Sequence, residues 1–342
     1  MTGAEIRPQA PPSLRCLELY CGIGGFAAAV SGSGASVVAA VDVNLLALGV
    51  YRANFPHAAI SAHLDTFATE RLAQLDAELW WASPPCQPFT RRGLRRGLGD
   101  PRGATFRALL GHLDGVRPKY FAMENVVGFA GSDAHRALRR TLSGAGYRAV
   151  REMELCPSEL GIPNRRPRFY LVAARGDLRD VAAEPTPSTG LPGDLQALLD
   201  PEPVDEALRP GGDLLKRYDG ALHIVDPTDP SAVTGCFTSA YGRSPVRSGS
   251  YLRAADGGVR RFSPSEILRL LGFPAGFRLP AELTLRQGWR LAGNSLSLEP
   301  VRRVLAAVPE LSALEGPSPL RRTGVDCETR TSKVLTIEPR RP

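Results

Sequence analysis

Short apolar segments alternate along the first half of the chain with segments whose apolar residues recur at helical spacing. The apolar runs at 14–20, 36–41, 78–82, 120–123, 147–152 and 168–173 have the length of buried strands. Between them, 68–75, 105–113 and 134–143 have the periodicity of helices. This alternation predicts an α/β domain with a parallel sheet, covered by helices on both faces and extending to about residue 175.

The pattern changes between residues 176 and 258, where proline and glycine are dense and predict a small, loop-rich lobe. Regular structure should return at Ser263, which can cap a helix that has Pro264 at its first position and Glu266 closing a capping box. This helix should end near Gly272, and another is expected near 299–308. We therefore expect one domain formed by 14–175 and 259–309, a lobe at 176–258, a flexible N-terminus at 1–13 and a disordered polar tail at 310–342.

Composition narrows the class of protein. None of the apolar runs in the 342 residues is long enough to cross a membrane, and residues 1–12 lack the apolar core of a signal peptide, so we expect a cytoplasmic location. The net charge of +7 suggests a polyanionic partner, although an arginine-rich compositional bias explains it equally well. The six cysteines are scattered, so neither a disulfide framework nor a metal site is expected.

A glycine-rich turn, Cys21-Gly22-Ile23-Gly24-Gly25, follows the first predicted strand. Glycines allow a tight turn and a close approach of ligand to backbone at the carboxyl end of a strand. Asp42 ends the second strand, where a carboxylate can bind ribose hydroxyls. The loop reads G-x-G-G with no following lysine to bind phosphate, so a nucleoside sulfonium fits better than a dinucleotide; a tight turn without a ligand is the alternative.

A stiff loop follows the predicted strand at 78–82. In Ser83-Pro84-Pro85-Cys86-Gln87-Pro88, three prolines fix the backbone, so that Cys86 is presented rather than packed. A thiolate at this position could add to a polarised double bond of a ring. The alternative is a buried structural cysteine. No histidine lies in these motifs, which argues against a Cys–His hydrolase.

Two further segments carry groups that ring addition requires. Glu124 ends the apolar strand that begins at Tyr120 and could carry a proton to a ring nitrogen. Arg166 and Arg168 alternate at the start of the last strand and could donate hydrogen bonds to a carbonyl oxygen or brace Glu124. Taken singly, these residues could equally be an exposed glutamate and solvated arginines.

Together, and in this order, these segments resemble the cytosine-5 methyltransferases. The family's glycine loop, acidic strand end, Pro-Cys loop, Glu-Asn-Val strand and Arg-x-Arg segment match those above, and the segments 270–274 (LLGFP) and 292–295 (AGNS) match its last two motifs. The resemblance covers about residues 14–308. It implies a Rossmann-like α/β fold that depends on S-adenosylmethionine, with a target recognition lobe at 176–258.

The resemblance also implies a mechanism. Cys86 would attack carbon 6 of cytosine, Glu124 would bind the ring nitrogen, and Arg168, with Arg166 beside it, would hold the ring oxygen. Carbon 5 would then take the methyl group from S-adenosyl-L-methionine, and loss of its proton would expel Cys86. The residues expected to line the cofactor pocket are Ile23, Gly24, Gly25, Asp42, Asp65, Ser83, Asn294 and Ser295.

Finer details favour tRNA over duplex DNA as the nucleic acid partner. The sequence LELY, Thr90 after the Pro-Cys loop and the Cys236-Phe237-Thr238 segment resemble the tRNA aspartate methyltransferase branch, which modifies cytosine 38 of the anticodon loop. The short lobe also suits duplex readout poorly. The residues expected to contact substrate are Arg91, Arg92, Arg95, Arg96, Cys236, Phe237 and Thr238.

Two alternatives remain: a DNA (cytosine-5)-methyltransferase of a modification system, and a non-catalytic relative that binds nucleic acid. The intact set of Cys86, Glu124 and Arg168 argues against the second. We expect the chain to be a monomer that binds no metal.

Overall fold

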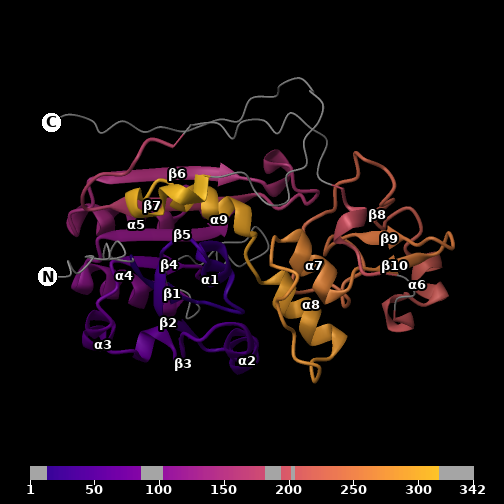
Figure 1. The fold of residues 1–342 in the computed structure, drawn as a ribbon, viewed down its shortest axis with the longest axis horizontal. Helices are drawn as coiled ribbons and strands as arrows, with labels where there is room; N and C mark the ends of the chain where they lie inside the picture. The colour runs from indigo at the N-terminus through magenta and orange to yellow at the C-terminus, as the bar shows by residue number, and fades with distance from the viewer. Residues whose placement is uncertain (1–13, 86–102, 182–193, 202–204, 316–342) are drawn as a thin grey trace, which may run out of the picture.

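The larger part of the molecule is built on a seven-stranded sheet with the order β3-β2-β1-β4-β5-β7-β6 (Figure 1). The computed structural model describes residues 14–85, 103–181, 194–201 and 205–315. The strands are β1 (Arg15–Leu19), β2 (Ser36–Asp42), β3 (Ala58–Ser61), β4 (Leu79–Ala82), β5 (Tyr120–Val126), β6 (Ala149–Leu155) and β7 (Arg168–Ala174). The sequence predicted all of them except β3, whose half-exposed Ala and Ser residues give little apolar signal.

One strand departs from the expected parallel arrangement. The five strands β3, β2, β1, β4 and β5, which are neighbours in the sheet in this order, pair in parallel. In contrast, β7 runs antiparallel to both of its neighbours, β5 and β6. The connection from β6 to β7 holds only a short 3-10 helix, Pro157–Leu160, instead of a helix that could lie along the sheet. The chain therefore returns beside β6 in the opposite direction.

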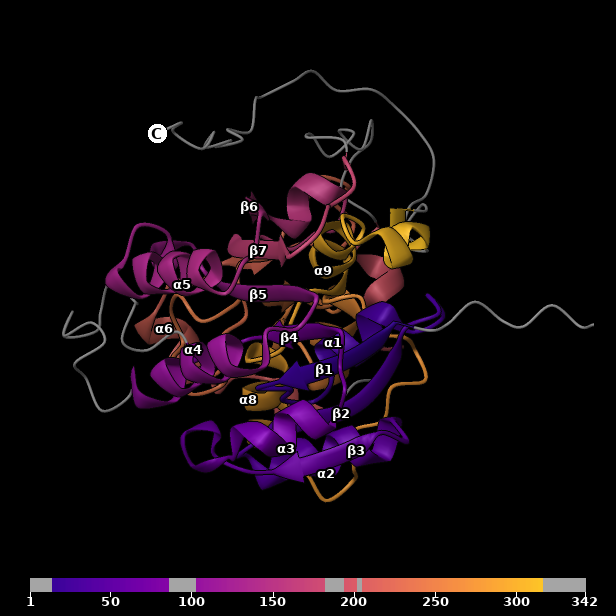
Figure 2. The same cartoon turned by 90° about the vertical axis from the view of Figure 1, so that its left-hand side faces the viewer.

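Helices cover both faces of this sheet, as the alternation predicted (Figure 2). One face packs against α1 (Gly25–Val30), α2 (Leu45–Asn54) and α9 (Leu298–Leu305), and the other against α3 (Thr69–Gln74), α4 (Ala104–Val116) and α5 (Asp133–Gly144). Trp80 and Trp81 illustrate the division, because successive strand residues point to opposite faces. Both are fully buried, one in each core cluster.

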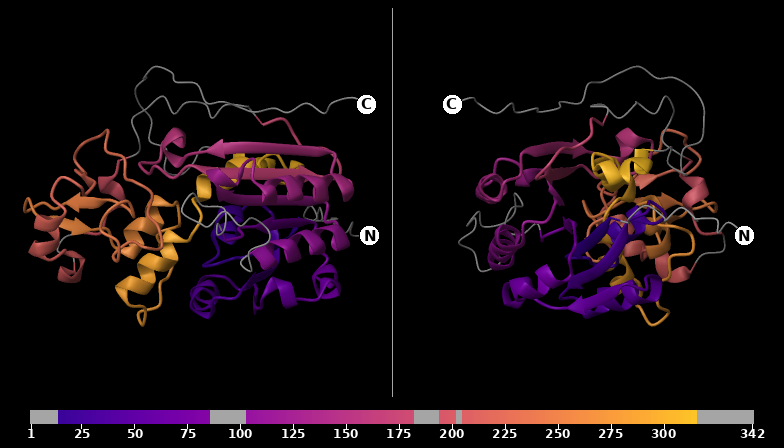
Figure 3. Two further views of the ribbon diagram at one scale, coloured as in Figure 1. Left: turned by 180° about the vertical axis from the view of Figure 1, so that it is seen from behind. Right: turned by 60° about the vertical axis from the view of Figure 1, so that its left-hand side comes forward.

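A smaller lobe lies beside one end of the sheet, with α7 (Pro264–Leu270) and α8 (Leu285–Gly293) next to it (Figures 1 and 3). It contains α6 (Gly212–Arg217) and three short strands, β8 (Ile224–Val225), β9 (Tyr251–Arg253) and β10 (Val259–Arg261). The predicted capping box of α7 is confirmed, with Ser263 and Glu266 bonded reciprocally. Helix α8 has a capping box of its own, Thr284 with Gln287, which the sequence analysis missed.

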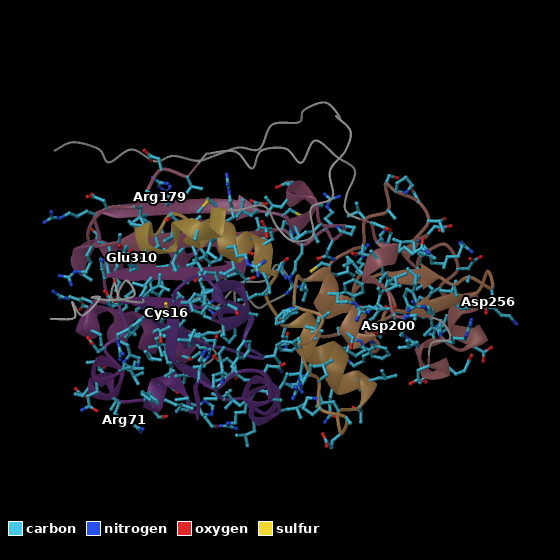
Figure 4. All side chains as sticks on the ribbon, viewed as in Figure 1. Cys16, Arg71, Arg179, Asp200, Asp256 and Glu310 are labelled. Carbon is cyan, nitrogen blue, oxygen red and sulfur yellow. The ribbon has the colours of Figure 1, made fainter. Side chains whose placement is uncertain are left out.

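Ionic contacts fasten the lobe and the end of the described chain. Arg260 and Glu266 form a buried pair at 2.7 Å, and Asp200 binds Arg269 of α7 on the lobe side of Figure 4. Residues 310–315 were expected in the disordered tail, but they belong to the 3-10 helix Pro309–Glu315. This segment is held because Glu310 accepts hydrogen bonds from Lys119 and Tyr120 (Figure 4).

No helix in the described ranges is long and apolar enough to span a membrane.

Candidate active site

The glycine loop between β1 and α1 is tightly packed. Gly24 has φ +92°, and a Cβ at this position would lie 2.4 Å from the ring of Phe55. A Cβ on Gly25 would lie 2.8 Å from Leu296. Leu296 directly follows the segment 292–295, so packing places the last sequence motif against the glycine loop, as the predicted cofactor pocket requires.

Asp42 joins the glycine loop to the end of β2. One carboxylate oxygen accepts a hydrogen bond from the Gly22 amide and the other from the Asn44 amide, both at 2.8 Å. The side chain is only half-buried. A carboxylate oxygen has two lone pairs, so each oxygen of Asp42 can accept a further hydrogen bond from a ligand hydroxyl.

Glu18 of β1 is a second carboxylate at this loop, which the sequence analysis did not single out. It is buried and accepts hydrogen bonds from the Phe26 and Ala27 amides at the start of α1, at 2.9 and 3.3 Å. Burial raises its pKa to about 8. Amides at the start of a helix commonly bind phosphate. Since Glu18 occupies them here, the loop is a poor cradle for a pyrophosphate and a better one for a nucleoside without phosphate.

Two apolar side chains lie exposed beside Asp42. Val43 is 49% exposed and Leu45 is 68% exposed, and no other large hydrophobic side chain is exposed in the described part of the chain. Binding sites for planar ligands combine apolar surface with a few polar groups. The apolar surface next to Asp42 suits a purine base, a role that the sequence analysis missed.

Asp65 and Ser83 lie at the same end of the sheet as Asp42. Burial raises the pKa of the Tyr20 hydroxyl, and the charges of Asp65 and Asp42 raise it further, so both carboxylates lie within electrostatic reach of Tyr20. The turn that carries Asp65 is held by His112, whose Nε2 lies 2.8 Å from the Leu64 carbonyl oxygen. Ser83 follows β4 and accepts a hydrogen bond from the Trp81 indole at 2.8 Å.

Cys86 and the arginines at 91, 92, 95 and 96 lie outside the described residues. The chain that leads to Cys86 is described as far as Pro85. Asn125 of β5 is buried and donates a hydrogen bond to the Pro84 carbonyl oxygen at 3.3 Å. The described chain therefore ends, one residue before Cys86, next to the strand that carries Glu124. This role of Asn125 was not predicted.

Glu124 and Arg168 form an ion pair where β5 and β7 adjoin. Their antiparallel register places Val126 opposite Arg168 and Glu124 opposite Tyr170. The Arg168 Nε lies 3.0 Å from a Glu124 carboxylate oxygen, and the two side chains are 16% and 13% exposed. Burial lowers the pKa of Arg168, but the charge of Glu124 and the contact with Cys236 together outweigh this effect, so the pKa is raised. The sequence-based expectation that an arginine braces Glu124 is met.

Arg166 has a different environment from Arg168. Its guanidinium is buried and donates hydrogen bonds to the carbonyl oxygens of Phe237 at 2.7 Å, Ser295 at 2.6 Å and Gly293 at 3.2 Å. These acceptors come from the lobe and from the end of α8. We therefore assign Arg166 a positioning role, in place of the substrate contact expected beside Arg168.

The segment Cys236-Phe237-Thr238 adjoins both arginines. The Cys236 sulfur lies 3.5 Å from Arg166 Nη1 and 3.7 Å from Arg168 Nη2. Burial raises the pKa of the Cys236 thiol, but the charges and hydrogen bonds of the two guanidinium groups together outweigh this effect, so the pKa is lowered. Phe237 is 1% exposed and packs in an aromatic cluster, so the expected substrate contact of its side chain is wrong.

Asn294 and Ser295 follow α8, between the glycine loop and the lobe. A Cβ on the preceding residue, Gly293, would lie 2.3 Å from the Thr238 carbonyl group, so glycine is required there. Ser295 is buried and Asn294 is exposed. Leu296 packs against Gly25, and Gly293 packs against Thr238. The predicted residues Asn294 and Ser295, which lie between Gly293 and Leu296, are thus placed between the glycine loop and the lobe.

Family comparison agrees with this geometry. Residues 14–204 match the model of the C-5 cytosine-specific DNA methylases, and the chain belongs to this family. It is a cytosine-5 methyltransferase with the α/β fold that the resemblance implied.

Particular relatives are similar over most of their length. A tRNA (cytosine(38)-C(5))-methyltransferase of Mus musculus is 33% identical, over 87% of this chain and 94% of the relative. A DNA (cytosine-5)-methyltransferase of Dictyostelium discoideum is 29% identical, over 85% and 93%. The crystal structure of the Dnmt2 methyltransferase of S. pombe superposes with a TM-score of 0.76 at 28% identity, over 87% of this chain and 97% of that one.

Proposed function

We propose that this enzyme methylates carbon 5 of a cytosine in tRNA, cytosine 38 in the anticodon loop of aspartate tRNA, through a covalent adduct with Cys86. The observation that carries this proposal is the Glu124–Arg168 pair, because Asn125, the neighbour of Glu124, holds Pro84 just before Cys86. The curated tRNA methyltransferases, similar over most of the chain, support tRNA as the substrate. A cytoplasmic location, where tRNA is abundant, belongs to the same proposal.

The residues at the glycine loop fit S-adenosyl-L-methionine, which supplies an electrophilic methyl group when bound. Asp42 would accept hydrogen bonds from the ribose hydroxyls, and the exposed side chain of Val43 would contact the adenine. Asp65 would face the polar edge of the base, while the backbone at Gly24 and the side chain of Asn294 would adjoin the methionine part. The use of the α1 amides by Glu18 supports a cofactor without phosphate.

In the proposed reaction the Cys86 thiolate forms a bond to carbon 6 of cytosine. Glu124 holds a proton at ring nitrogen 3, so that the electron pair of the carbon 5–carbon 6 double bond moves to carbon 5. Arg168 fixes the Glu124 carboxylate and donates to the ring oxygen. The electron pair on carbon 5 would form the bond to the methyl group, and the electrons of the broken carbon–sulfur bond would return to the sulfonium sulfur. Carbon 5 then loses its proton to a base, and this electron pair restores the carbon 5–carbon 6 double bond and expels the Cys86 thiolate.

The family also contains enzymes that act on DNA, and the Dictyostelium relative keeps duplex DNA as the second candidate substrate. The lobe argues for tRNA. Its three strands contain only two or three residues each and offer little rigid surface to enter a major groove. A base in an anticodon loop is already unpaired, which removes most of the cost of flipping it out.

The deciding experiment offers aspartate tRNA and duplex DNA at equal cytosine concentration with a labelled methyl donor, followed by bisulfite sequencing. We expect methylation at one anticodon-loop cytosine and little in the duplex. Cys86→Ala should abolish transfer, and wild type should form a stable adduct with tRNA that contains 5-fluorocytosine at the target position. Site-specific methylation of the duplex with unmodified tRNA would instead support the DNA enzyme.

A further inference from the structure

Three exposed arginines lie on segments that lead directly into the active site. Arg165 precedes the buried Arg166, while Arg243 and Arg247 lie on the loop that follows Thr238. Within the ranges that the structure describes, none of the three side chains forms an ion pair or a hydrogen bond. Arg209 of the lobe, in contrast, is paired with Asp256 at 2.7 Å.

The loop that carries Arg243 and Arg247 is firmly held at its base. The Thr238 amide donates to the Ser248 carbonyl oxygen at 2.9 Å. The Tyr241 hydroxyl donates to the Ser250 carbonyl oxygen at 2.6 Å and accepts from the Phe262 amide at 3.0 Å. Arg247 itself has φ +59°, an uncommon backbone conformation for a residue with a side chain. The arginines are therefore displayed from a fixed loop.

The base of this loop adjoins the reaction centre. Thr238 lies two residues after Cys236, whose sulfur is 3.7 Å from Arg168 Nη2. On the other side, the Arg165 amide donates to the Thr234 carbonyl oxygen at 2.8 Å. Arg165 is thus next to Arg166 in the chain, and the loop with Arg243 and Arg247 begins two residues after Cys236, which contacts Arg168.

This part of the lobe has a one-sided charge. Residues 230–255 contain no Asp or Glu, and the one further arginine in the range, Arg253, interacts with Asp226. A guanidinium presents several donors in a plane and binds phosphate oxygens in pairs. Fixed, unpaired guanidiniums without neighbouring carboxylates are suited to an anionic polymer.

We propose that Arg165, Arg243 and Arg247 form a phosphate-binding rim that holds the RNA backbone on the side of the target cytosine that faces the lobe. This inference rests on the proposed function, because it assumes that the substrate is RNA. None of these three arginines is among the substrate contacts that were predicted from the sequence.

The test compares two variants that each lose two positive charges. Arg243→Gln/Arg247→Gln removes them from the rim. The control, Arg140→Gln/Arg148→Gln, removes exposed arginines of α5 and of the turn before β6, and Figure 1 shows α5 at the end of the sheet away from the lobe. Affinity for aspartate tRNA is measured by filter binding between low and moderate salt, and affinity for S-adenosylmethionine by calorimetry.

We expect the rim variant to bind tRNA about ten-fold more weakly than wild type at low salt. The salt slope, which is the steepness with which the logarithm of the binding constant falls with the logarithm of the salt concentration, should decrease by about 1.4, since each contact to single-stranded phosphate contributes about 0.7. Adding Arg165→Gln should lower the slope by about a further 0.7. Cofactor affinity should stay at the wild-type value, and Arg243→Lys/Arg247→Lys should keep most of the slope.

A rim variant with the wild-type salt slope, or one that differs no more than the control, overturns the inference. Loss of binding to duplex DNA but not to tRNA also overturns it. If wild-type enzyme neither binds nor methylates tRNA, the proposed function itself fails, a result that the wild-type arm reveals before any variant is compared.

Discussion

Asp42 and Glu18 are two carboxylates that each accept two backbone amides at the glycine loop, yet their surroundings give them different roles. Asp42 is half-buried at the end of β2, so its remaining lone pairs can reach a ligand. Glu18 lies beneath the loop, where it caps the start of α1 and has no access to solvent. Under the proposed function the first residue binds the ligand, and the second stabilises the glycine loop.

For Asp42, we predict that Asp42→Ala weakens S-adenosylmethionine binding by about 2–4 kcal/mol, the contribution of one or two hydrogen bonds to a charged group. The amides of Gly22 and Asn44 also lose their acceptor, which adds to the loss. Titration calorimetry measures the change. The exposed Asp213→Ala in α6 is the control and should bind like wild type. An unchanged affinity in folded Asp42→Ala would remove Asp42 from the cofactor site.

For Glu18, we predict a pH-dependent contribution to stability. Burial raises its pKa from 4.5 to about 8 in the folded state, so the folded protein binds more protons than the unfolded chain between these values. This contribution is therefore full below about pH 4.5 and is lost as the pH rises through 8.

Urea unfolding at several pH values between 5 and 8 tests this effect. Glu18→Gln, which cannot ionise, should lose stability less steeply with rising pH than wild type does. The exposed Glu70→Gln should keep the wild-type slope. Parallel profiles for wild type and Glu18→Gln would contradict the assignment.

At the scale of elements, strand ends fix the described chain on both sides of the segment 86–102. Asn125 of β5 holds Pro84 before it. After it, the Tyr20 hydroxyl at the end of β1 lies 2.9 Å from the carbonyl oxygen and 3.0 Å from the hydroxyl of Thr105, in the first turn of α4. The ends of β1 and β5 therefore hold the described residues Pro84 and Thr105, which flank the segment that contains Cys86.

We predict that Tyr20→Phe, which removes only the hydroxyl group, lowers the single-turnover rate of methyl transfer by about 3–10-fold, because small misplacements of reacting groups are costly. Cofactor affinity should change less than two-fold. Rapid-quench assays and calorimetry measure the two quantities, with Tyr218→Phe in the lobe as control. Weaker cofactor binding at an unchanged rate would show that the hydroxyl serves the pocket instead.

Across the whole molecule, Arg166 joins three parts that are distant in the sequence. It precedes β7, and its guanidinium binds carbonyl oxygens of the lobe and of the end of α8. No single element could place these groups together. The carboxyl ends of β5 and β6 point toward the lobe (Figures 1 and 3), so this contact lies where the sheet meets the lobe.

We predict that Arg166→Leu lowers the free energy of unfolding by about 3–5 kcal/mol, because three buried carbonyl oxygens lose their donor. Arg140→Leu, on the exposed side of α5, should change it by less than about 0.5 kcal/mol. Urea unfolding measures both. A stable Arg166→Leu variant that has lost only tRNA affinity would return Arg166 to the substrate contacts.

The sequence by itself determined those features of the fold that depend on residues close together in the chain. The apolar runs predicted six of the seven strands of the larger sheet, Ser263 and Glu266 predicted the start of α7, and the order of motifs predicted the family. Strand length, helix capping and glycine turns are fixed within a few residues, so a local pattern reveals them.

Only the tertiary structure decided the contacts between residues far apart in the chain. The direction of β7 against β5, the hold of Asn125 on Pro84 and the carbonyl acceptors of Arg166 all depend on packing across about 40 to 130 residues. The burial of Phe237 depends on aromatic packing that includes Phe262. An arginine that binds substrate and one that binds backbone carbonyls look alike in a sequence. What separates Arg168 from Arg166 is whether a carboxylate or a set of carbonyl oxygens lies opposite the guanidinium after folding.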